Sequence, residues 1–327
     1  MRTALREVLG IETPIVLAPI NGGTRLAAAV SNAGGLGMLA ASSQDAATLR
    51  EQLRELRTMT SHPFAANMIT AFPQQERLDV CLEEGVRIVS FFWGDPAPLM
   101  ARAKKAGAQV MQTVCSAADA RRAVDSGVDV VVAQGWEAGG HVQGTVATMA
   151  LIPAVVDAVG RVPVVAAGGI ADGRGMAAAL ALGAAGVWMG TRFLVAEEAA
   201  IHPDYQQRVL AAIETDTTYL ENLFDVGWPN APHRVIRNST VANWEAAGRP
   251  ASGMRPGEGE VIATSPSRGD IVRYRSFVPV ADVRGDVEAL SLWAGQSIGL
   301  VRTRRPAAAI VREIVDDAHA ILRRLAA

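Results

Sequence analysis

The sequence predicts an α/β protein, a (β/α)8 barrel that carries a mostly helical insertion after its eighth strand. Eight short apolar runs alternate with helical patterns along the first two-thirds of the chain, which is typical of strand–helix units in a parallel sheet. The runs are nearly continuous instead of alternating, as expected for strands covered on both faces. Gly85, Gly107 and Gly127 each follow a helical stretch and precede a strand, at almost equal intervals. A doubly wound open sheet is the alternative, and the number of strands favours the barrel.

The expected elements follow one another in order along the chain, and each unit is closed by a glycine. We expect strands at residues 15–18, 37–40, 64–69, 88–92, 109–114, 128–133, 164–167 and 186–189. We expect helices between them at residues 45–58, 74–84, 98–106, 117–126 and 174–182.

The strand–helix alternation stops near Val195, and the following segment has few strand-like runs and many prolines. We interpret this segment as a mostly helical cap, with a Gly- and Pro-rich loop around residues 250–266. A helix over residues 306–325 follows, with Pro306 in its first turn, and is expected to close the barrel. Its apolar stripe consists of Ile310, Ile314, Val315, Ala318, Ile321, Leu322 and Leu325. The chain therefore divides into a barrel, an insertion and a closing helical segment, at residues 1–196, 197–285 and 286–327.

The composition excludes several classes of function. Apolar residues make up 50% and charged residues 20% of the chain, which predicts a folded core instead of disorder. A formal net charge of −2 provides no basic surface, so we expect no nucleic-acid partner and no binding to anionic lipid. The first residues lack a signal-peptide core and the longest apolar stretches are interrupted, so we expect no membrane span and a cytoplasmic protein. Two cysteines are too few for a disulfide framework, and the five histidines lack metal-ligand spacing, so no metal site is expected.

Three glycine-rich turns follow expected strands, so a barrel would gather them at one end. They occupy residues 137–141, 167–173 and 189–193. The turns after strands seven and eight have the form of a phosphate cradle, because glycine lets backbone N–H groups approach an anion and the next helix adds its positive N-terminal dipole. Phosphorylated sugars, thiazoles and flavin mononucleotide (FMN) all use such a cradle. The alternative is a set of tight turns that bind no ligand.

The distribution of lysine and cysteine narrows the chemistry. Lys104 and Lys105 are the only lysines, and both lie in an expected outer helix. A Schiff-base aldolase needs a buried lysine at a strand end, so this class is excluded. Flavin barrels of the hydroxy-acid-oxidase and dihydroorotate-dehydrogenase kinds also use a strand-end lysine near the flavin. Neither lysine of this chain is available for that role. Cys115 follows the fifth strand, where a single small thiol beside the core is more typical of packing than of a nucleophile.

His141 is the strongest candidate for a catalytic base. An imidazole titrates near neutral pH and can accept a C–H proton that an adjacent electron-withdrawing group activates. Gly139 and Gly140 remove side chains next to it and leave room for a planar ring and a small substrate. The alternative interpretation is a histidine that only caps the turn.

Several segments of the barrel resemble the nitronate monooxygenase family, formerly called 2-nitropropane dioxygenases. They are residues 14–19, 31–37, 137–141, 167–172 and 189–193, and the tail at residues 294–297 is also similar. The resemblance spans nearly the whole barrel, and Glu-Ala-Gly-Gly-His at 137–141 is quite specific within flavin barrels. It implies non-covalently bound FMN, an inserted helical domain and His141 as the catalytic base. The FMN contacts that it implies are Ala18, Pro19, Ile20, Asn67, Gln112, Gln134, Gly139, Gly168, Gly169, Gly190 and Thr191.

The chemistry of the implied contacts agrees with a flavin, because Asn and Gln amides both donate and accept hydrogen bonds along the polar edge of the isoalloxazine. The chain departs from the family pattern at two places. Ile20, followed by Asn-Gly-Gly, stands where family members commonly have methionine after the first-strand Ala-Pro. The Arg-Gly or Ile-Gly that usually follows the histidine is replaced by Val142-Gln143-Gly144. Both changes fall on the expected substrate side of the site. The resemblance to the family therefore supports FMN binding more directly than it supports the identity of the substrate.

The resemblance favours the oxidation of an alkyl nitronate, or a similarly acidic small molecule, by FMN and dioxygen. His141 would remove a proton where the substrate is the neutral acid. One alternative is an NADPH-dependent FMN enoyl-thioester (enoyl-acyl-carrier-protein) reductase, because those enzymes share the Gly-Gly-His element. Another is a non-catalytic flavin-binding protein, which the changed residues motivate. The apolar outer faces of the barrel would also permit a homodimer.

Overall fold

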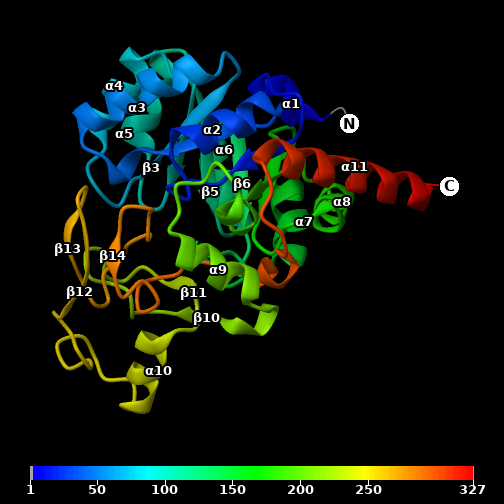
Figure 1. Cartoon of the computed structure of the whole chain (residues 1–327). Coiled ribbons are helices and arrows are strands. Elements are labelled where there is room, and N and C mark those ends of the chain that lie inside the picture. The colour runs from blue at the N-terminus through cyan, green and yellow to red at the C-terminus, as the bar shows by residue number, and fades with distance from the viewer. Residues whose placement is uncertain (1–2, 327) are drawn as a thin grey trace.

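The computed structural model describes residues 3–326, in which eight parallel strands form a central barrel (Figure 1). The strands stand in the order β1-β9-β8-β6-β5-β4-β3-β2. A parallel bridge between Val16 and Leu36 joins β1 to β2 and closes the sheet. The predicted (β/α)8 barrel is confirmed. Its strands are β1 (Ile15–Leu17), β2 (Gly37–Ala40), β3 (Phe64–Ile69), β4 (Ile88–Phe92), β5 (Gln109–Val114), β6 (Val130–Gln134), β8 (Val164–Ala167) and β9 (Gly186–Met189).

The observed strand boundaries follow the expected ones closely, with two differences. β1 ends one residue before the expected range of 15–18. β6 covers Val130–Gln134 instead of 128–133, because Gln134 still pairs with Ala167 of β8. This shift places the side chain of Gln134 at the carboxyl end of the sheet, where a barrel enzyme has its active site.

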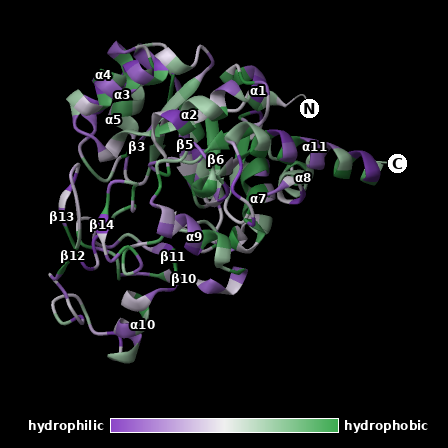
Figure 2. Ribbon diagram, in the orientation of Figure 1, coloured by the Kyte–Doolittle hydropathy of each residue, from purple (hydrophilic) through white to green (hydrophobic). Residues whose placement is uncertain are grey.

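Amphipathic helices surround the barrel, and Figure 2 shows hydrophobic strands at its centre and hydrophilic residues on the outer helices. In α3, for example, Leu49, Leu53 and Leu56 are fully buried at helical spacing. The surrounding helices are α2 (Gly23–Asn32), α3 (Ala46–Met59), α4 (Gln75–Glu83), α5 (Ala97–Lys105), α6 (Ala117–Asp125), α7 (Thr148–Val159) and α8 (Gly173–Ala181). The short α1 (Ala4–Leu9) lies at the amino-terminal end of the strands, where Gln109 of β5 donates to the carbonyl oxygen of Val8. Among residues 3–326, no helix has the length and apolarity needed to cross a bilayer.

The last helix, α11 (Ala307–Ala326), takes the eighth outer position and packs against α8 and α2 (Figure 1). Ile310, Ile314 and Ala318 form its buried stripe, whereas Leu325, which the expected stripe included, is exposed. The close approach of the two helices requires glycine at position 173. A Cβ there would lie 2.4 Å from the Cβ of Asp317.

The segment after the barrel is not mostly helical, which corrects the expectation for residues 197–285. These residues, all described by the structure, include α9 (Pro203–Ala211), β10 (Thr217–Leu220), β11 (His233–Ile236), α10 (Ser239–Ala246), β12 (Val261–Ser265), β13 (Gly269–Val272) and β14 (Arg284–Gly285). β10 pairs with β11, and β12 pairs with β13 and β14, all antiparallel. β12 lies inside the stretch of 250–266 that was expected to be a loop. These strands are only two to five residues long, and β12 and β13 form a tight local hairpin at the edge of the stretch that was expected to be a loop.

A buried ion-pair network holds the insertion together. The Arg255 side chain is 1% exposed, and its Nη1 lies 2.7 Å from Asp225 Oδ1 and 2.8 Å from the carbonyl oxygen of Leu223. Its Nε donates to Glu258 Oε1 at 3.0 Å, and its guanidinium stacks 4.4 Å from the ring centroid of Tyr274. These contacts anchor the segment that precedes Trp228, whose indole reaches the site described next.

Candidate active site

The three glycine-rich turns meet at the carboxyl ends of the barrel strands. Gly168 packs so closely on the first turn that a Cβ there would lie 2.9 Å from the carbonyl oxygen of Gly135. At Gly139 a Cβ would lie 2.3 Å from the backbone nitrogen of Gly295, so glycine is needed here for contact with the tail of the chain. The N–H of Gly295 donates to Thr191 Oγ1 at 3.0 Å, which joins the tail to the third turn.

Backbone N–H groups without partners line the second and third turns. Gly168 and Gly169 have φ angles of 100° and 71°, a left-handed conformation that glycine adopts at little cost. Within residues 3–326 the N–H groups of Gly168, Gly169 and Gly190 make no hydrogen bond. Free, convergent N–H groups are what a phosphate cradle requires.

The side chain of Asp172 caps the N-terminus of α8, where it accepts from the N–H groups of Arg174 at 3.0 Å and Gly175 at 3.1 Å. These two N–H groups are therefore not available to a phosphate. The carboxylate already satisfies these donors. The available donors therefore come from the glycine turns and from the start of the 3-10 helix η2 (Thr191–Val195), which has no side-chain cap.

The end of the first strand lies beside the third turn. The N–H of Ala18 donates to the carbonyl oxygen of Met189 at 2.9 Å. A Cβ at Gly190 would lie 3.2 Å from Ile20 Cγ2 and 3.3 Å from Ala18 Cβ. The structure therefore brings the segment Ala18, Pro19 and Ile20 together with Gly190 and Thr191, as the sequence-based site requires.

Two amides of the expected site stand at strand ends, and one of them has an unused acceptor. Asn67 is buried, and its Nδ2 donates to Ser90 Oγ at 3.2 Å. Gln134 Nε2 donates to the carbonyl oxygen of His141 at 3.1 Å, while its Oε1 is buried without a partner among the described residues. The orphaned oxygen and the free N–H groups of the cradle fit the polar ring edge and the phosphate of FMN, so the residues present suit this cofactor.

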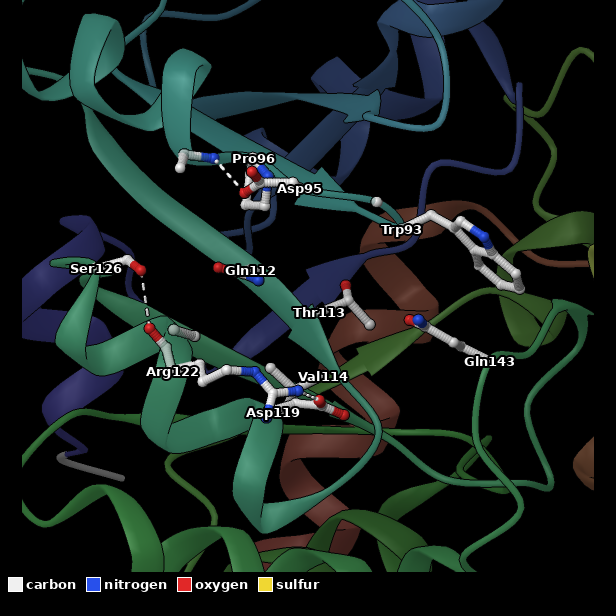
Figure 3. Close-up of a pocket in the computed structure, with 13 residues that line it drawn as sticks. Trp93, Asp95, Pro96, Gln112, Thr113, Val114, Asp119, Arg122, Ser126 and Gln143 are labelled. Carbon is white, nitrogen blue, oxygen red and sulfur yellow. Dashed lines mark hydrogen bonds and ion pairs between the residues drawn. The ribbon is translucent and has the colours of Figure 1, made fainter.

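Gln112 is not brought together with the other expected FMN contacts. Side chains alternate along a strand, and Gln112 shares its face with Val114, on the side of α6 (Figure 3). Thr113 lies on the opposite face, in the same strand register that pairs it with Val132. The strand itself was predicted correctly, and the alternation of its side chains explains why Gln112 faces away from Asn67 and Gln134.

His141 lies in a short strand, β7 (Gly140–His141), that pairs antiparallel with β11 of the insertion. Three indoles surround its imidazole, with ring centroids 3.9 Å away for Trp228, 5.1 Å for Trp293 and 6.3 Å for Trp93. Its Nε2 lies 3.5 Å from Ser276 Oγ. Burial lowers the pKa of His141 to about 3, and the neighbouring His233 adds to this shift. The imidazole is therefore neutral at physiological pH and can accept a proton.

His233 is fully buried and plays a structural part. Its Nδ1 lies 2.9 Å from the carbonyl oxygen of Ala231, and its Nε2 accepts from the N–H of Phe224 at 3.2 Å. Only the neutral tautomer with the proton on Nδ1 satisfies both contacts. Burial lowers the pKa of His233 to about 4, in agreement with a neutral ring.

Sequence reasoning missed the residues that surround His141. Ser276, Trp228 and Trp293 come from the insertion and the segment after it, and no spacing in the sequence connects them with His141. Cys115 stays outside this chemistry, because burial and its hydrogen bond to Asp119 raise the pKa of the thiol to about 12. Among the described residues, no three or more metal-ligating side chains gather into a cluster.

A (β/α)8 barrel with a glycine cradle, an orphaned amide acceptor and a neutral imidazole defines an oxidoreductase of the flavin-barrel class. The chain belongs to the nitronate monooxygenase family, whose sequence profile matches residues 2–76 and 65–317. The members of this family are FMN-dependent oxidoreductases.

Individual relatives differ in the reactions that their names describe. A protein of Rhodococcus jostii named (3aS,4S,5R,7aS)-5-hydroxy-7a-methyl-1-oxo-octahydro-1H-indene-4-carboxyl-CoA dehydrogenase is 40% identical over 76% of this chain and 69% of its own length. A nitronate monooxygenase of Paraburkholderia phytofirmans is 32% identical over 96% of this chain and 94% of its own. The structure of FabK from Thermotoga maritima superposes with a TM-score of 0.84 and 35% identity, covering 99% of this chain and 98% of that one.

Proposed function

We propose that this protein oxidises alkyl nitronates, or similarly acidic small molecules, with FMN as cofactor and dioxygen as oxidant. The observation that carries the proposal is the neutral imidazole of His141, held among three indoles next to the glycine cradle. Membership of the nitronate monooxygenase family supports the same reaction.

The residues that would hold FMN divide into two groups. Gly168, Gly169 and Gly190 would bind the phosphate through their free N–H groups. Gln134 and Asn67 would face the polar edge of the ring system, and the orphaned Oε1 of Gln134 would accept a hydrogen bond there. When bound, FMN supplies the electron acceptor that dioxygen regenerates.

His141 would act directly on the substrate. Where the substrate is a neutral nitroalkane, the imidazole removes the proton from the carbon next to the nitro group. Ser276 lies near Nε2 and orients the ring. The surrounding indoles exclude water from the reacting carbon, which favours a small apolar substrate.

The test is an anaerobic absorbance titration of the purified holoenzyme with ethyl nitronate, compared with nitroethane. We expect the nitronate to bleach the flavin band in the wild type. His141→Ala should keep FMN and lose turnover on nitroethane by roughly a hundredfold. If His141→Ala retains FMN and full turnover on nitroethane, the role assigned to this histidine is wrong.

A second candidate function is the NADPH-dependent reduction of an enoyl thioester. The Rhodococcus relative, whose name describes a CoA thioester substrate, shares a larger fraction of identical residues than the nitronate monooxygenase of Paraburkholderia. The close superposition with FabK adds support at the level of the fold. Bleaching of the flavin by NADPH, coupled to reduction of crotonyl thioester, would favour this candidate over nitronate oxidation.

A further inference from the structure

One residue of the insertion, Arg234 of β11, contacts both ends of the turn that carries His141. The backbone of Arg234 pairs with that of Gly140, at the end of this turn. Its side chain reaches the start of the same turn, where Nη2 donates to the carbonyl oxygen of Trp136 at 2.9 Å. Within residues 3–326, no other donor reaches this carbonyl oxygen. Arg234 therefore fixes the turn at the two points between which its path is set.

Two aromatic rings fix the guanidinium of Arg234. Its Cζ lies 4.6 Å from the ring centroid of Trp136 and 5.8 Å from that of Tyr219 in β10. A cation over an aromatic face is attracted by the ring, and the attraction is stronger where water is excluded. Arg234 is only 2% exposed, so the side chain has little freedom to leave the carbonyl oxygen that it contacts.

The guanidinium lies on the face of the small sheet that is turned away from the imidazole of His141. Side chains alternate along a strand, so neighbouring residues of β11 point to opposite faces. The ring of His233 faces that of His141, with centroids 5.8 Å apart. Arg234 comes next in the strand and points to the other face, where it meets Trp136 and Tyr219. Arg234 therefore acts on His141 through the backbone of the turn.

The surroundings of Arg234 do not offset the burial of its charge. Arg255, whose side chain is similarly buried, has the carboxylates of Asp225 and Glu258 as partners. No carboxylate of the described residues lies within 4.0 Å of the Arg234 guanidinium, and its buried Nε has no hydrogen-bond partner there. A buried cation without an ionic partner contributes little to stability, and exceptions of this kind are expected at functional sites. A role in the site explains the arginine better than a role in stability.

The turn that Arg234 contacts also packs on the glycine cradle. The N–H of Gly135 donates to the carbonyl oxygen of Ala167 at 2.9 Å. The carbonyl oxygen of Gly135 would lie 2.9 Å from a Cβ on Gly168. The barrel therefore holds the turn on one side and Arg234 holds it on the other, so a shift on the insertion side moves His141 relative to the cradle.

We propose that Arg234 is a positioning residue for the proposed base. Its guanidinium, through the carbonyl oxygen of Trp136, sets the position of the His141 imidazole relative to the glycine cradle. The inference rests on the proposed function in one respect, namely that His141 removes a proton from the substrate.

Hydrogen exchange of the holoenzyme tests the structural half of the proposal. Arg234→Met keeps a long unbranched side chain and removes the donor and the charge. We expect the amides of residues 135–146 to exchange at least about tenfold faster in this variant, relative to the amides of β3, which report global stability. A loosened turn should open more often than the barrel core does.

Arg77→Met is the matched control. Arg77 of α4 is also without a carboxylate within 4.0 Å among the described residues. It also donates to backbone carbonyl oxygens, namely those of Gln44 at 2.6 Å and Pro73 at 3.2 Å. Its removal should leave the exchange of residues 135–146, relative to β3, as in the wild type.

Turnover tests the catalytic half, because nitroethane must lose a proton and ethyl nitronate has already lost it. The ratio of kcat/KM for nitroethane to that for ethyl nitronate should fall at least about tenfold in Arg234→Met, since a small displacement of a base costs this much or more. The ratio should not change in Arg77→Met. A merely structural role would lower both rates by the same factor and leave the ratio unchanged.

Arg234→Lys is the second variant and serves where Arg234→Met does not fold. It keeps the charge and a donor but not the planar guanidinium, so the turnover ratio should fall by about threefold. The proposal is overturned if hydrogen exchange or the turnover ratio in Arg234→Met matches that in Arg77→Met. Where only Arg234→Lys folds, a turnover ratio equal to that of the wild type overturns it.

The two measurements separate this proposal from the proposed function. If the wild type does not oxidise nitroethane, proton removal by His141 fails, and hydrogen exchange alone decides whether Arg234 positions the turn. If nitroethane is oxidised and the turnover ratio does not change in Arg234→Met, Arg234 is not a positioning residue while the function stands.

Discussion

The imidazole of His141 lies against the indole of Trp228, with ring centroids 3.9 Å apart and planes inclined by 30°. Trp228 belongs to the turn between β10 and β11, so the insertion determines how much space remains beside the proposed base. The same indole contacts Trp93 at 5.3 Å and Phe72 at 5.4 Å between centroids. An aromatic wall built largely by loops therefore bounds the space beside His141.

Trp228→Ala should enlarge the space beside His141 and favour branched substrates. We expect kcat/KM for the nitronate of 2-nitropropane, relative to that of ethyl nitronate, to rise roughly tenfold, because one extra methyl group is worth about this factor in an apolar pocket. Oxygen consumption measures both rates. Trp244→Ala is the control, since this indole donates to the carbonyl oxygen of Pro250. An unchanged ratio in Trp228→Ala would show that Trp228 does not limit substrate size.

The low pKa of His141 has a consequence for substrate choice. A general base works best when its pKa lies near the working pH, and burial holds that of His141 at about 3. We therefore expect kcat/KM for ethyl nitronate, which is already ionised, to exceed that for neutral nitroethane by about a hundredfold. Between about pH 5 and about pH 8, titration of His141 should produce no acid limb. An acid limb near the usual histidine pKa that disappears in His141→Gln would contradict this expectation.

The buried neutral His233 predicts a pH dependence of stability. Burial lowers its pKa to about 4, whereas a histidine in the unfolded chain titrates near about 6.5. The unfolded chain therefore binds more protons between these values, so this contribution is complete above about pH 6.5 and is lost as the pH falls toward 4. The slope from one such histidine reaches at most about 1.4 kcal/mol per pH unit.

His233→Gln tests this dependence, because glutamine can donate to Ala231 and accept from Phe224 without titrating. We expect the free energy of unfolding in urea to change less between about pH 7 and about pH 5 in this variant than in the wild type. Equal slopes for the two proteins would assign the pH dependence to other groups.

Gly168→Ala should impair FMN binding beyond its effect on stability. Gly168 has a φ angle of 100°, and a Cβ there would lie 2.9 Å from the carbonyl oxygen of Gly135. Gly107 has a φ angle of 77° and no described atom within 4 Å of such a Cβ, so Gly107→Ala is the matched control. Both variants carry about 1–2 kcal/mol of left-handed strain, but only Gly168→Ala displaces the cradle. The flavin-to-protein absorbance ratio after gel filtration should fall in Gly168→Ala alone, and equal ratios would exclude Gly168 from the cofactor site.

Arg255→Ala should destabilise the protein by about 3 kcal/mol, because it leaves the carboxylates of Asp225 and Glu258 without their buried partner. Arg54→Ala removes an arginine whose side chain is 65% exposed and should cost at most about 0.5 kcal/mol. Urea unfolding measures both differences. Comparable losses in the two variants would show that the network around Arg255 does not anchor the insertion.

The barrel could be predicted from the sequence because its strands are buried on both faces. All residues of β8 and all but Gln134 of β6 are buried, so these strands are continuous runs of valine and alanine that local inspection detects. The strands of the insertion gave no such signal. β11 is equally buried, but it contains His233 and Arg234, and its partner β7 is only two residues long.

The part of the candidate site that consists of glycine turns could be predicted from the sequence. The side chains that reach His141 from distant parts of the sequence could not. The glycine turns converge because parallel strands place their carboxyl ends at one edge. Ser276, in contrast, lies 135 residues from His141 in the sequence, and nothing local connects the two. Gln112 illustrates a third case, since a shift of one residue along a strand moves a side chain to the opposite face.

The contact between Gly139 and Gly295 joins two segments that are synthesised at different times. The turn that carries His141 packs on a segment near the end of the chain, and Gly295 also donates to Thr191, 104 residues earlier. During synthesis, the barrel strands leave the ribosome well before this segment does. The turn that carries His141 and the turn that begins at Thr191 therefore reach their final contacts only after Gly295 has been made.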